Sequence, residues 1–349
     1  MILFLSHYPT NETIKDGMSQ RITNIDEYFS SDERIYLNVS FRKFIKKKTR
    51  YQENIIILNR NFFIHFFEIC NYFLKAKKIY IHSVFNALQS LLLINFIKND
   101  YILDVHGVVP EENLLEGKKY LYHIFNFCEK IVFKKAKYII CVTEAMKNHY
   151  LKKFPKSKAN YIIFPILPNT ITERFELTQL EDSNTLLNIV YSGNTQKWQN
   201  IELMSVIIAE NLSPNIKYYI LTGNVHEMNE IIGKKVDLPN KQIEILSVNP
   251  EDLKEYYVKC HYGFILRDDI VVNNVSCPTK LIEYMYYGIT PIVLSTSIGD
   301  FEKYGYEYID KNRTFIDLKP YKSNKNIQII KQMVISKSNI NLHQEIFSK

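Results

Sequence analysis

The feature that most constrains the fold is a regular alternation of short apolar runs with longer amphipathic stretches. In the first half, helical patterns over 17–29, 84–98 and 117–136 stand between apolar runs. Strands separated by helices of about 10–20 residues predict parallel βαβ units. The expected strands of this half are MILFLS, RIYLNV, NIIIL, KIYIH, YILDV (101–105) and YIICV (138–142).

The alternation is interrupted once and then begins again. Residues 164–184, FPILPNTITERFELTQLEDSN, combine two prolines with polar and acidic residues, which is typical of an interdomain linker. The new strands are LLNIVYSG, IKYYILTG, QIEIL, YGFIL and ITPIVL, and the helices lie near 199–210, 225–233, 250–259 and 279–287. We therefore expect an α/β chain with two Rossmann-like doubly wound domains.

The expected boundaries follow from this pattern. Residues 1–167 form one domain and 168–330 the second, and 331–349 form a tail that we expect to be a helix packed back on the first domain. Ligands of open α/β sheets bind beyond the carboxyl ends of the strands. We expect the ligand in a central cleft that the two domains face.

Cysteine usage and hydropathy indicate the compartment. The five cysteines are odd in number and contain no CxxC pair, which argues against a disulfide framework or a zinc site and fits a reducing environment. No apolar run approaches the length of about 18 residues that a membrane span needs, and the first residues lack the basic start of a signal peptide. We expect a cytoplasmic protein.

The charge is unevenly distributed along the chain. Residues 1–169 contain 25 Lys and Arg against 15 Asp and Glu, whereas the remainder contains 19 against 22. A basic half suggests an anionic partner, either a phospholipid surface or a nucleic acid, or simply a solvated basic face. The aromatic segment 60–78 follows the basic segment 41–50, so the pair either seats this domain on anionic lipid or forms a core helix beside a charged loop.

The strand-end loops of the second half offer groups suited to a nucleotide diphosphate. Lys197, Arg267 and Lys280 supply cations, and glycines that follow strands let the backbone approach a phosphate. Glu283 supplies a carboxylate, which can accept two hydrogen bonds from the vicinal hydroxyls of a ribose. Lys280 and Glu283 are three residues apart on one helix face, so a simple ion pair is the alternative.

Two segments carry a resemblance to a known family. PTKLIEYMYYGITPIV (278–293) resembles the signature of the second domain in GT-B glycosyltransferases of family 4. YSGNTQKWQNIELM (191–204) is similar to the first strand, loop and helix of that domain in bacterial surface-polysaccharide transferases. The resemblance implies the GT-B fold, Glu283 on the ribose hydroxyls and the three cations near the diphosphate. The implied nucleotide-sugar-binding residues are Gly17, Gly193, Asn194, Lys197, Gly223, Asn274, Pro278, Thr279 and Glu283.

The sequence departs from the family pattern at two positions. The usual E-x7-E motif would place an acid where Val275 stands, and the arginine that commonly follows the first glycine is Asn194. We expect Arg267 to supply the missing charge from another loop, and Asn273 or Asn274 to make polar contacts near the absent acid.

The first half resembles the same family in two loops. HYPTNETIKDGMSQRITNI (7–25) is similar to its glycine-bearing first loop, which implies that backbone N–H groups near Gly17 approach the sugar phosphate. ILDVHGVVPEE (102–112) resembles the strand end that places a histidine, here His106, beside the donor sugar. Glu111 and Glu112 are the expected acceptor-side residues, and Thr143 is expected to cap a helix.

These resemblances imply a retaining, metal-independent hexosyltransferase without a cofactor. It would move a sugar from a nucleotide-diphosphate sugar, with UDP favoured, to a hydroxyl of a glycan or lipid-linked acceptor in bacterial cell-surface polysaccharide synthesis. The expected catalytic residues are His106, Arg267 and Lys280. The alternatives are a catalytically weak partner subunit, which Val275 and Asn194 motivate, and a GT-B sugar-nucleotide epimerase. Nucleic-acid binding has no signature here. The expected location is the cytoplasm, with the inner face of the plasma membrane as an alternative.

Overall fold

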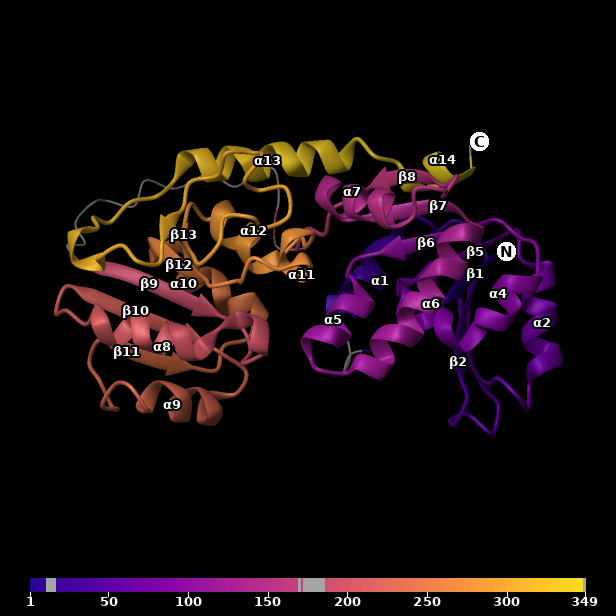
Figure 1. The fold of residues 1–349 in the computed structure, drawn as a ribbon, viewed down its shortest axis with the longest axis horizontal. Helices are drawn as coiled ribbons and strands as arrows, with labels where there is room; N and C mark the ends of the chain where they lie inside the picture. The colour runs from indigo at the N-terminus through magenta and orange to yellow at the C-terminus, as the bar shows by residue number, and fades with distance from the viewer. Residues whose placement is uncertain (11–16, 169–170, 172–185, 348–349) are drawn as a thin grey trace. The chain divides into compact units, whose positions relative to one another are not determined.

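The computed structural model describes residues 1–10, 17–168, 171 and 186–347 and divides the chain into two compact units. Unit 1 contains Met1–Pro165 and Ile340–Lys349, and unit 2 contains Ile166–Asn339. The chain therefore passes from one unit to the other twice (Figure 1). Most of the expected linker, 164–184, and part of the expected first loop, 11–16, lie outside the described residues.

Unit 1 is built on an eight-stranded sheet in the order β3-β4-β2-β1-β5-β6-β7-β8. Neighbouring strands are parallel except β3, which pairs antiparallel with β4 at the edge. The expected apolar runs form β1, β2, β4, β5, β6 and β7, because a strand buried on both faces needs a nearly continuous apolar sequence. The strands are β1 (Ile2–Leu5), β2 (Arg34–Ser40), β3 (Lys48–Gln52), β4 (Ile55–Asn61), β5 (Lys78–His82), β6 (Tyr101–Val105), β7 (Ala136–Cys141) and β8 (Asn160–Ile163).

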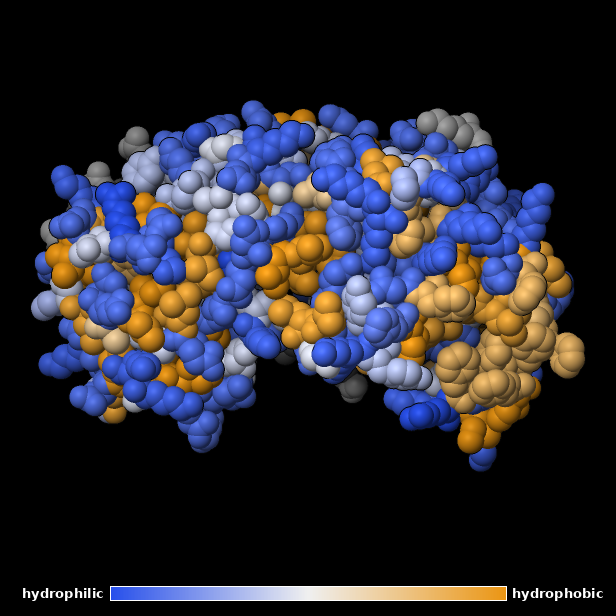
Figure 2. Space-filling model, viewed as in Figure 1, coloured by the Kyte–Doolittle hydropathy of each residue, from blue (hydrophilic) through white to orange (hydrophobic). Residues whose placement is uncertain are grey.

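Helices connect the strands of unit 1. Thr143 caps α7 as expected, since its hydroxyl accepts a hydrogen bond from Met146 N at 3.0 Å. The single helix expected over 84–98 is instead α3, a 3-10 turn (η1, Leu88–Ser90) and α4. Figure 2 shows hydrophobic surface over α2 and α4. The helices are α1 (Gly17–Glu27), α2 (Phe66–Lys75), α3 (Ser83–Ala87), α4 (Leu91–Phe96), α5 (Val109–Leu115), α6 (Lys119–Lys135), α7 (Glu144–Lys153) and α14 (Leu342–Phe347).

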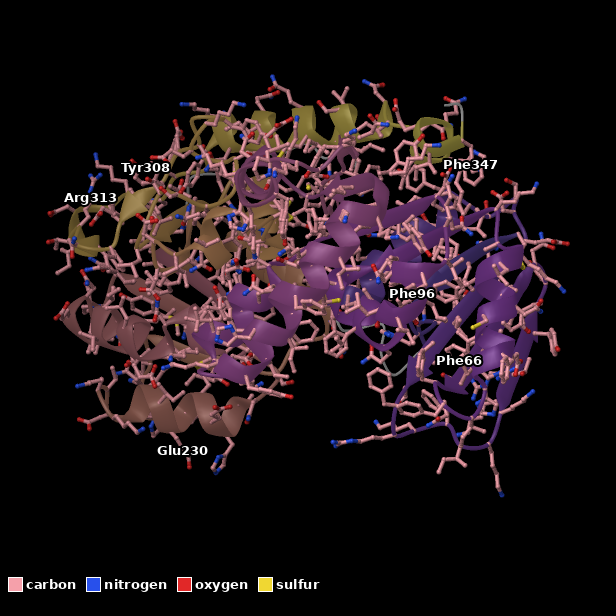
Figure 3. All side chains as sticks on the ribbon, turned by 45° about the vertical axis from the view of Figure 1, so that its right-hand side comes forward. Phe66, Phe96, Glu230, Tyr308, Arg313 and Phe347 are labelled. Atoms are coloured by element: carbon pink, nitrogen blue, oxygen red, sulfur yellow. The ribbon has the colours of Figure 1, made fainter. Side chains whose placement is uncertain are left out.

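The core of unit 1 includes residues from both ends of the chain. Phe4 on β1 stacks on Tyr36 of β2 with ring centroids 4.8 Å apart, because the two residues are in register across the sheet. Leu342 and Ile346 of α14 are fully buried in the same cluster. Figure 3 labels Phe347 at the end of this helix, where its ring lies 5.0 Å from Lys78 Nζ. Residues 342–347 thus complete the core of a unit that begins at residue 1.

Unit 2 is built on a six-stranded parallel sheet in the order β11-β10-β9-β12-β13-β14. Its strands are β9 (Leu187–Ser192), β10 (Ile216–Leu221), β11 (Ile243–Leu246), β12 (Tyr262–Ile265), β13 (Thr290–Val293) and β14 (Ile309–Asp310). Its helices are α8 (Ile201–Glu210), α9 (Val225–Gly233), α10 (Leu253–Lys259), α11 (Val271–Asn274), α12 (Thr279–Tyr286) and α13 (Asn324–Ser338), with 3-10 turns η2 (Lys197–Gln199), η3 (Pro250–Asp252) and η4 (Phe315–Asp317). The expected α/β class with two Rossmann-like domains is confirmed.

The strand order of unit 2 indicates where a ligand would bind. Along the chain, β9 leads to β10 and β11 on one side, while β12 leads to β13 and β14 on the other. The order reverses between β9 and β12, and crevices of open sheets form at the carboxyl ends of strands at such a reversal. The loop 193–200 after β9 and the segment 266–278 after β12 both begin there.

Among the described residues, no helix combines the length and the apolar character needed to cross a bilayer.

Candidate functional site

Helix α12 begins after a proline and ends at a glycine, and it carries two of the charged side chains expected at the site. Pro278 is its N-cap, and the helix begins at Thr279, which is half-buried. At the other end Gly288 has φ +68°, its N–H donates to Met285 O at 3.0 Å, and Ile289 N–H donates to Tyr284 O at 2.8 Å. This Schellman pattern requires a left-handed residue and so explains the glycine.

Lys280, in the first turn of α12, points its amine at the carboxyl end of β9. Its Nζ donates to Gln199 Oε1 at 2.9 Å and lies 4.0 Å from the centroid of the Tyr191 ring. Burial lowers the pKa of the Lys280 amine well below its usual value, and the nearby Arg267 lowers it further. The amine is therefore held where its charge is poorly solvated.

Arg267 follows β12 and brings a second cation to the same place. Its Nη1 donates to Ser276 Oγ at 3.3 Å. Burial lowers the pKa of the guanidinium to about 10, so that it remains charged at neutral pH. Within the described part of the chain, neither Arg267 nor Lys280 forms an ion pair with a carboxylate. The carboxyl of Glu283 acts on Lys280 from one turn away and opposes the effect of Arg267 on the Lys280 pKa, but it does not contact either cation directly. Two neighbouring, poorly solvated cations without a direct carboxylate contact favour the binding of an anion between them.

Glu283 lies one turn after Lys280 but has its own partner. Tyr257 Oη donates to Glu283 Oε2 at 3.3 Å, and Tyr257 Oη lies 2.7 Å from Ser192 Oγ. Burial raises the pKa of the Glu283 carboxyl to about 7, against the opposing effects of Tyr257 and Lys280. Tyr284 Oη accepts a hydrogen bond from Ser192 N at 2.9 Å, so hydroxyl groups connect α12 to the end of β9.

Gly193, the first residue after β9, permits the approach of Lys280. Its φ is +149°, and a Cβ there would lie 2.9 Å from Lys280 Nζ and 3.1 Å from Tyr191 Oη. Only glycine fits this position without displacing one of them. The structure therefore brings Gly193, Arg267 and Lys280 together at the reversal point.

Three other expected nucleotide-binding residues of unit 2, Asn194, Lys197 and Gly223, are exposed on nearby segments. Asn194 Oδ1 accepts from Gln196 N at 3.2 Å. Gly223 follows β10, and a Cβ added there would meet no atom within 4 Å. Their contact with a ligand stays a prediction.

The segment 268–275 ends at Val275, where the family motif has an acid, and hydrogen bonds within the segment hold it. Asn274 Nδ2 donates to Asp269 Oδ1 at 2.6 Å, and Asn273 Nδ2 donates to Asp268 O at 2.8 Å. Val275 is 5% exposed, so the position where the family motif has an acid is filled by a buried apolar side chain.

In unit 1, His106 directly follows β6 and lies close to a buried ion pair. Arg21 donates to both carboxylate oxygens of Asp104, at 3.1 and 2.9 Å, and both side chains are fully buried. Arg21 and His82 hold the pKa of Asp104 well below its usual value, and His106 contributes to the shift. Gly17, the first residue of α1, is exposed.

The two expected acceptor-side acids both have partners within unit 1. Glu111 pairs with Lys153 at 2.7 Å, and Glu112 Oε1 accepts from Val108 N at 3.0 Å. Lys153 also pairs at 2.7 Å with the fully buried Glu129, whose pKa burial raises to about 7. An acceptor contact of Glu111 or Glu112 stays a prediction.

Sequence reasoning missed the residues that position the charged groups. Tyr191, Gln199 and Tyr257 contact Lys280 or Glu283, yet Gln199 is 81 residues from Lys280 and Tyr257 is 26 residues from Glu283. No spacing rule links residues at such distances. The one signal in the sequence for these partners was Tyr191, which stands near the end of β9, two residues before Gly193.

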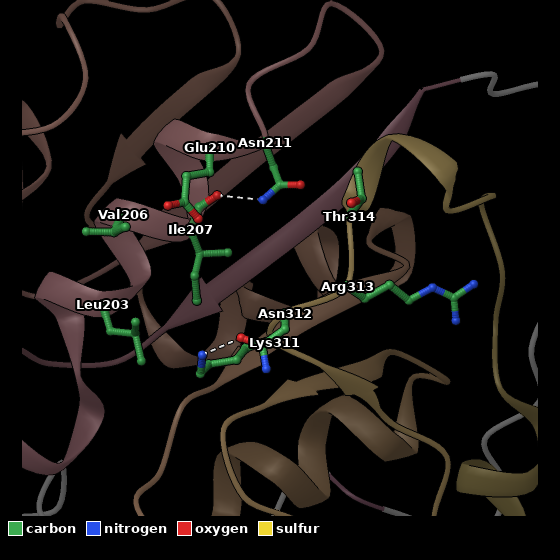
Figure 4. A pocket seen from close by; sticks show the side chains of 9 residues that line it. All are labelled: Leu203, Val206, Ile207, Glu210, Asn211, Lys311, Asn312, Arg313 and Thr314. Atoms are coloured by element: carbon green, nitrogen blue, oxygen red, sulfur yellow. Dashed lines mark hydrogen bonds between the residues drawn. The ribbon is translucent and has the colours of Figure 1, made fainter.

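A pocket of about 420 Å³ lies elsewhere in unit 2, between α8 and residues 311–314 (Figure 4). Asn211 there accepts a hydrogen bond from Phe315 N, which ties α8 to η4. The expected site residues do not line this pocket. Among the described residues, no cluster of His, Cys, Asp or Glu could hold a metal ion.

No family model matches the chain, and no curated protein matches its sequence. Solved structures do match it over nearly its whole length. Sucrose-phosphate synthase from Thermosynechococcus elongatus superposes with a TM-score of 0.59 at 11% identity, covering 97% of this chain and 90% of that one.

Two further structures agree with this match. A glycosyltransferase from Rickettsia africae gives a TM-score of 0.59 at 12% identity, covering 99% of this chain and 98% of that one. HepE from Anabaena in complex with UDP and glucose gives a TM-score of 0.57 at 10% identity, covering 97% and 91%. These matches define the class of fold: the chain has the GT-B fold of glycosyltransferases.

Proposed function

We propose that this protein is a glycosyltransferase that uses a nucleotide-diphosphate sugar, with a UDP-sugar favoured. The observation that carries the proposal is the pair of desolvated cations, Lys280 and Arg267, beside Gly193 at the carboxyl ends of β9 and β12. Neither has a carboxylate partner within the described chain. Such a pair is suited to a ligand that brings its own negative charge.

A diphosphate fits this arrangement better than a single carboxylate would. It spreads its charge over several oxygens, so that it can accept from Lys280 Nζ and from the guanidinium of Arg267 at once. When the sugar leaves, charge grows on the diphosphate, and fixed cations in a poorly solvated site stabilise that charge without a metal ion. Lys197 and the backbone near Gly193 and Asn194 would add donors from the loop after β9.

The base and ribose would lie toward Glu283, Asn274 and Gly223. An ionised Glu283 can accept hydrogen bonds from both ribose hydroxyls, and Tyr257 holds the carboxyl in place. HepE, one of the matching structures, has been solved with UDP and glucose and with UDP-glucose. That similarity supports the choice of a UDP-sugar.

Unit 1 would supply the groups around the reacting sugar and the acceptor. We place His106 near the anomeric centre, the N–H groups of α1 near Gly17 at the sugar phosphate, and Glu111 or Glu112 on the acceptor side. The proposed reaction retains the anomeric configuration and transfers a hexose to a hydroxyl of a glycan or lipid-linked acceptor. The proposed pathway is bacterial cell-surface polysaccharide or glycoconjugate synthesis.

One observation favours a second candidate, a catalytically weak partner subunit. Val275 fills with a buried side chain the position where the family motif has an acid, and Asn194 stands where an arginine is common. A protein of this kind would bind glycan or stabilise another transferase, and would transfer little sugar itself.

Calorimetric titration of the purified chain with UDP, GDP, CMP and their sugars tests the proposal. We expect binding of one nucleotide, and a loss of roughly 10- to 100-fold in affinity for Lys280→Met, because a charge-assisted bond is removed. Lys235→Met, an exposed lysine of the same unit, is the control and keeps full affinity. Failure of every nucleotide to bind would refute the proposal.

Hydrolysis and transfer assays with the same sugar nucleotides separate the two candidates. Turnover of a bound sugar nucleotide supports the transferase, whereas binding without turnover supports the partner subunit.

A further inference from the structure

Unit 1 exposes an unusual set of large apolar side chains on and around α2. Phe67 is 86% exposed and Leu74 is 69% exposed, and the turn before the helix exposes Phe63 and Ile64. Phe67 and Leu74 are seven residues apart in α2, so they lie along one face of the helix, and Phe63 precedes that helix in the adjoining turn. A soluble monomer rarely leaves such a continuous apolar face uncovered.

Helix α4 extends this face. Asn99, just after α4, donates hydrogen bonds to Phe73 O and Ala76 O at the end of α2, both at 3.0 Å. Phe96, the last residue of α4, is 75% exposed. Figure 2 shows continuous hydrophobic surface over these two helices, and Figure 3 shows Phe66 and Phe96 on this part of the unit.

A strongly basic segment is fixed at the edge of the apolar face. Residues 41–50 contain Arg42, Lys43, Lys46, Lys47, Lys48 and Arg50 and no acid, and all six are exposed. Asn61 Nδ2 holds this loop through Phe41 O at 3.1 Å and Lys43 O at 3.0 Å. The Phe41 ring lies 5.7 Å from that of Phe63, so the basic loop adjoins the start of α2.

The acid that pairs with this loop does not offset its charge. Glu68 on α2 pairs with Lys47 at 2.7 Å and with Arg60 at 2.9 Å. These two cations exceed the single charge of the carboxylate. The face therefore presents exposed aromatic and aliphatic groups beside a net positive rim.

We propose that this α2 surface, formed by Phe63, Ile64, Phe67, Leu74 and Phe96 with the basic residues 41–50, docks on the surface of an anionic phospholipid bilayer. The apolar side chains would enter the boundary between headgroups and acyl chains, while lysines and arginines stay among the anionic headgroups. The inference does not depend on the donor or on the reaction.

The chemistry of the surface favours lipid over the other partners of a basic patch. A nucleic acid would be bound by cations and by aromatic rings that stack on bases, and the exposed aliphatic chains Ile64, Ile45 and Leu74 would gain nothing from it. A lipid interface takes up aliphatic and aromatic chains alike and attracts lysines through its own charge.

Cosedimentation of the full chain with vesicles tests the proposal. Phosphatidylcholine vesicles with phosphatidylglycerol should bind the wild-type chain, and pure phosphatidylcholine vesicles should bind it much less. The double variant Phe63→Ser, Phe67→Ser and the triple variant Lys43→Glu, Lys46→Glu, Lys48→Glu should each bind on the order of 100-fold more weakly to the anionic vesicles. All five side chains are exposed, so the fold should be kept, which circular dichroism checks.

Matched controls lie in unit 2. Ile335→Ser, an exposed apolar residue of α13, and Lys234→Glu with Lys235→Glu should leave vesicle binding unchanged. The proposal is overturned if the wild-type chain does not bind anionic vesicles, or if the unit 2 variants lose binding as much as the α2 surface variants do. It is also overturned if the chain dimerises in light scattering and Phe63→Ser, Phe67→Ser makes it monomeric, because the face would then be a contact between two copies of this chain.

Discussion

The amine of Lys280 lies 4.0 Å from the centroid of the Tyr191 ring, so a helix residue and a strand residue 89 positions apart form one cation-π contact. The contact holds the lysine at the end of β9, next to Gly193 and with Gln199 as its hydrogen-bond partner. The face of an aromatic ring stabilises a nearby cation, but less than a paired carboxylate would. The amine is thus oriented but keeps its capacity to bind an anion.

The first prediction concerns stability at Lys280. Because its desolvated charge has no carboxylate partner, Lys280→Met should keep the free energy of unfolding within about 1 kcal/mol of the wild type or raise it. The same variant should lose nucleotide affinity, so stability and binding should change independently. Urea unfolding and calorimetric titration measure the two. A variant that is both unstable and binding-deficient would show that Lys280 has a structural role.

The second prediction concerns pH and Glu283. Its folded pKa of about 7 is above its usual value, so between those two values the folded state holds the proton more tightly than the unfolded state does. Stability from this group is therefore full at pH values below the ordinary glutamate pKa and is lost as the pH rises toward 7. Glu283→Gln should be more stable than the wild type above pH 7, by about 1–3 kcal/mol.

The check is a series of urea titrations from pH 4.5 to 8. The difference between Glu283→Gln and wild type should grow up to about pH 7 and then level off. A difference that does not vary with pH would contradict the raised pKa. Glu302→Gln, an exposed glutamate of the same unit, should follow the wild-type curve.

The third prediction compares two glycines that follow neighbouring strands. Gly193→Ala should destabilise the chain by about 1–3 kcal/mol and weaken nucleotide binding, because its backbone conformation is unfavourable for alanine and the new Cβ meets Lys280 Nζ. Gly223→Ala, with open space around it, should change the unfolding temperature little. Thermal unfolding of both variants measures the difference, and equal effects would contradict the geometry.

The fourth prediction concerns the Arg21–Asp104 pair in the core of unit 1. Asp104→Ala leaves a buried guanidinium without its carboxylate, which typically costs about 3–5 kcal/mol. The unfolding temperature of the full chain, measured by calorimetry, should fall by on the order of 10 °C. Glu116→Ala removes an exposed pair with Lys118 and should have almost no effect. A small shift for Asp104→Ala would mean that water reaches Arg21.

Most strands of both sheets could be predicted because they are largely buried and therefore mostly apolar. Three strands, β3, β8 and β14, gave no such signal. Every residue of β3 is exposed, β8 is half-buried apart from an exposed first residue, and β14 has only two residues. Helix 84–98 was expected as one piece, yet it is interrupted at η1, where Ser90 is buried. Edge strands and helix breaks depend on tertiary contacts that local patterns do not record.

For the candidate site, the sequence could place Lys280 and Glu283 on one helix face, since that depends on local spacing. It could not show that each has a different partner. Gln199 and Tyr257 reach them only because β9, α10 and α12 converge in the folded unit. The desolvation that shifts their pKa values likewise arises from the whole unit.

The packing of α14 in unit 1 has a consequence for how the protein is made. Leu342 and Ile346 are fully buried in the core of unit 1, yet they follow the whole of unit 2 in the chain and are synthesised after it. During synthesis, unit 2 can be complete in sequence while unit 1 still lacks part of its core. Unit 1 therefore begins to emerge from the ribosome before unit 2 but can finish folding only after it, because the surface that α14 covers stays open until α14 is made.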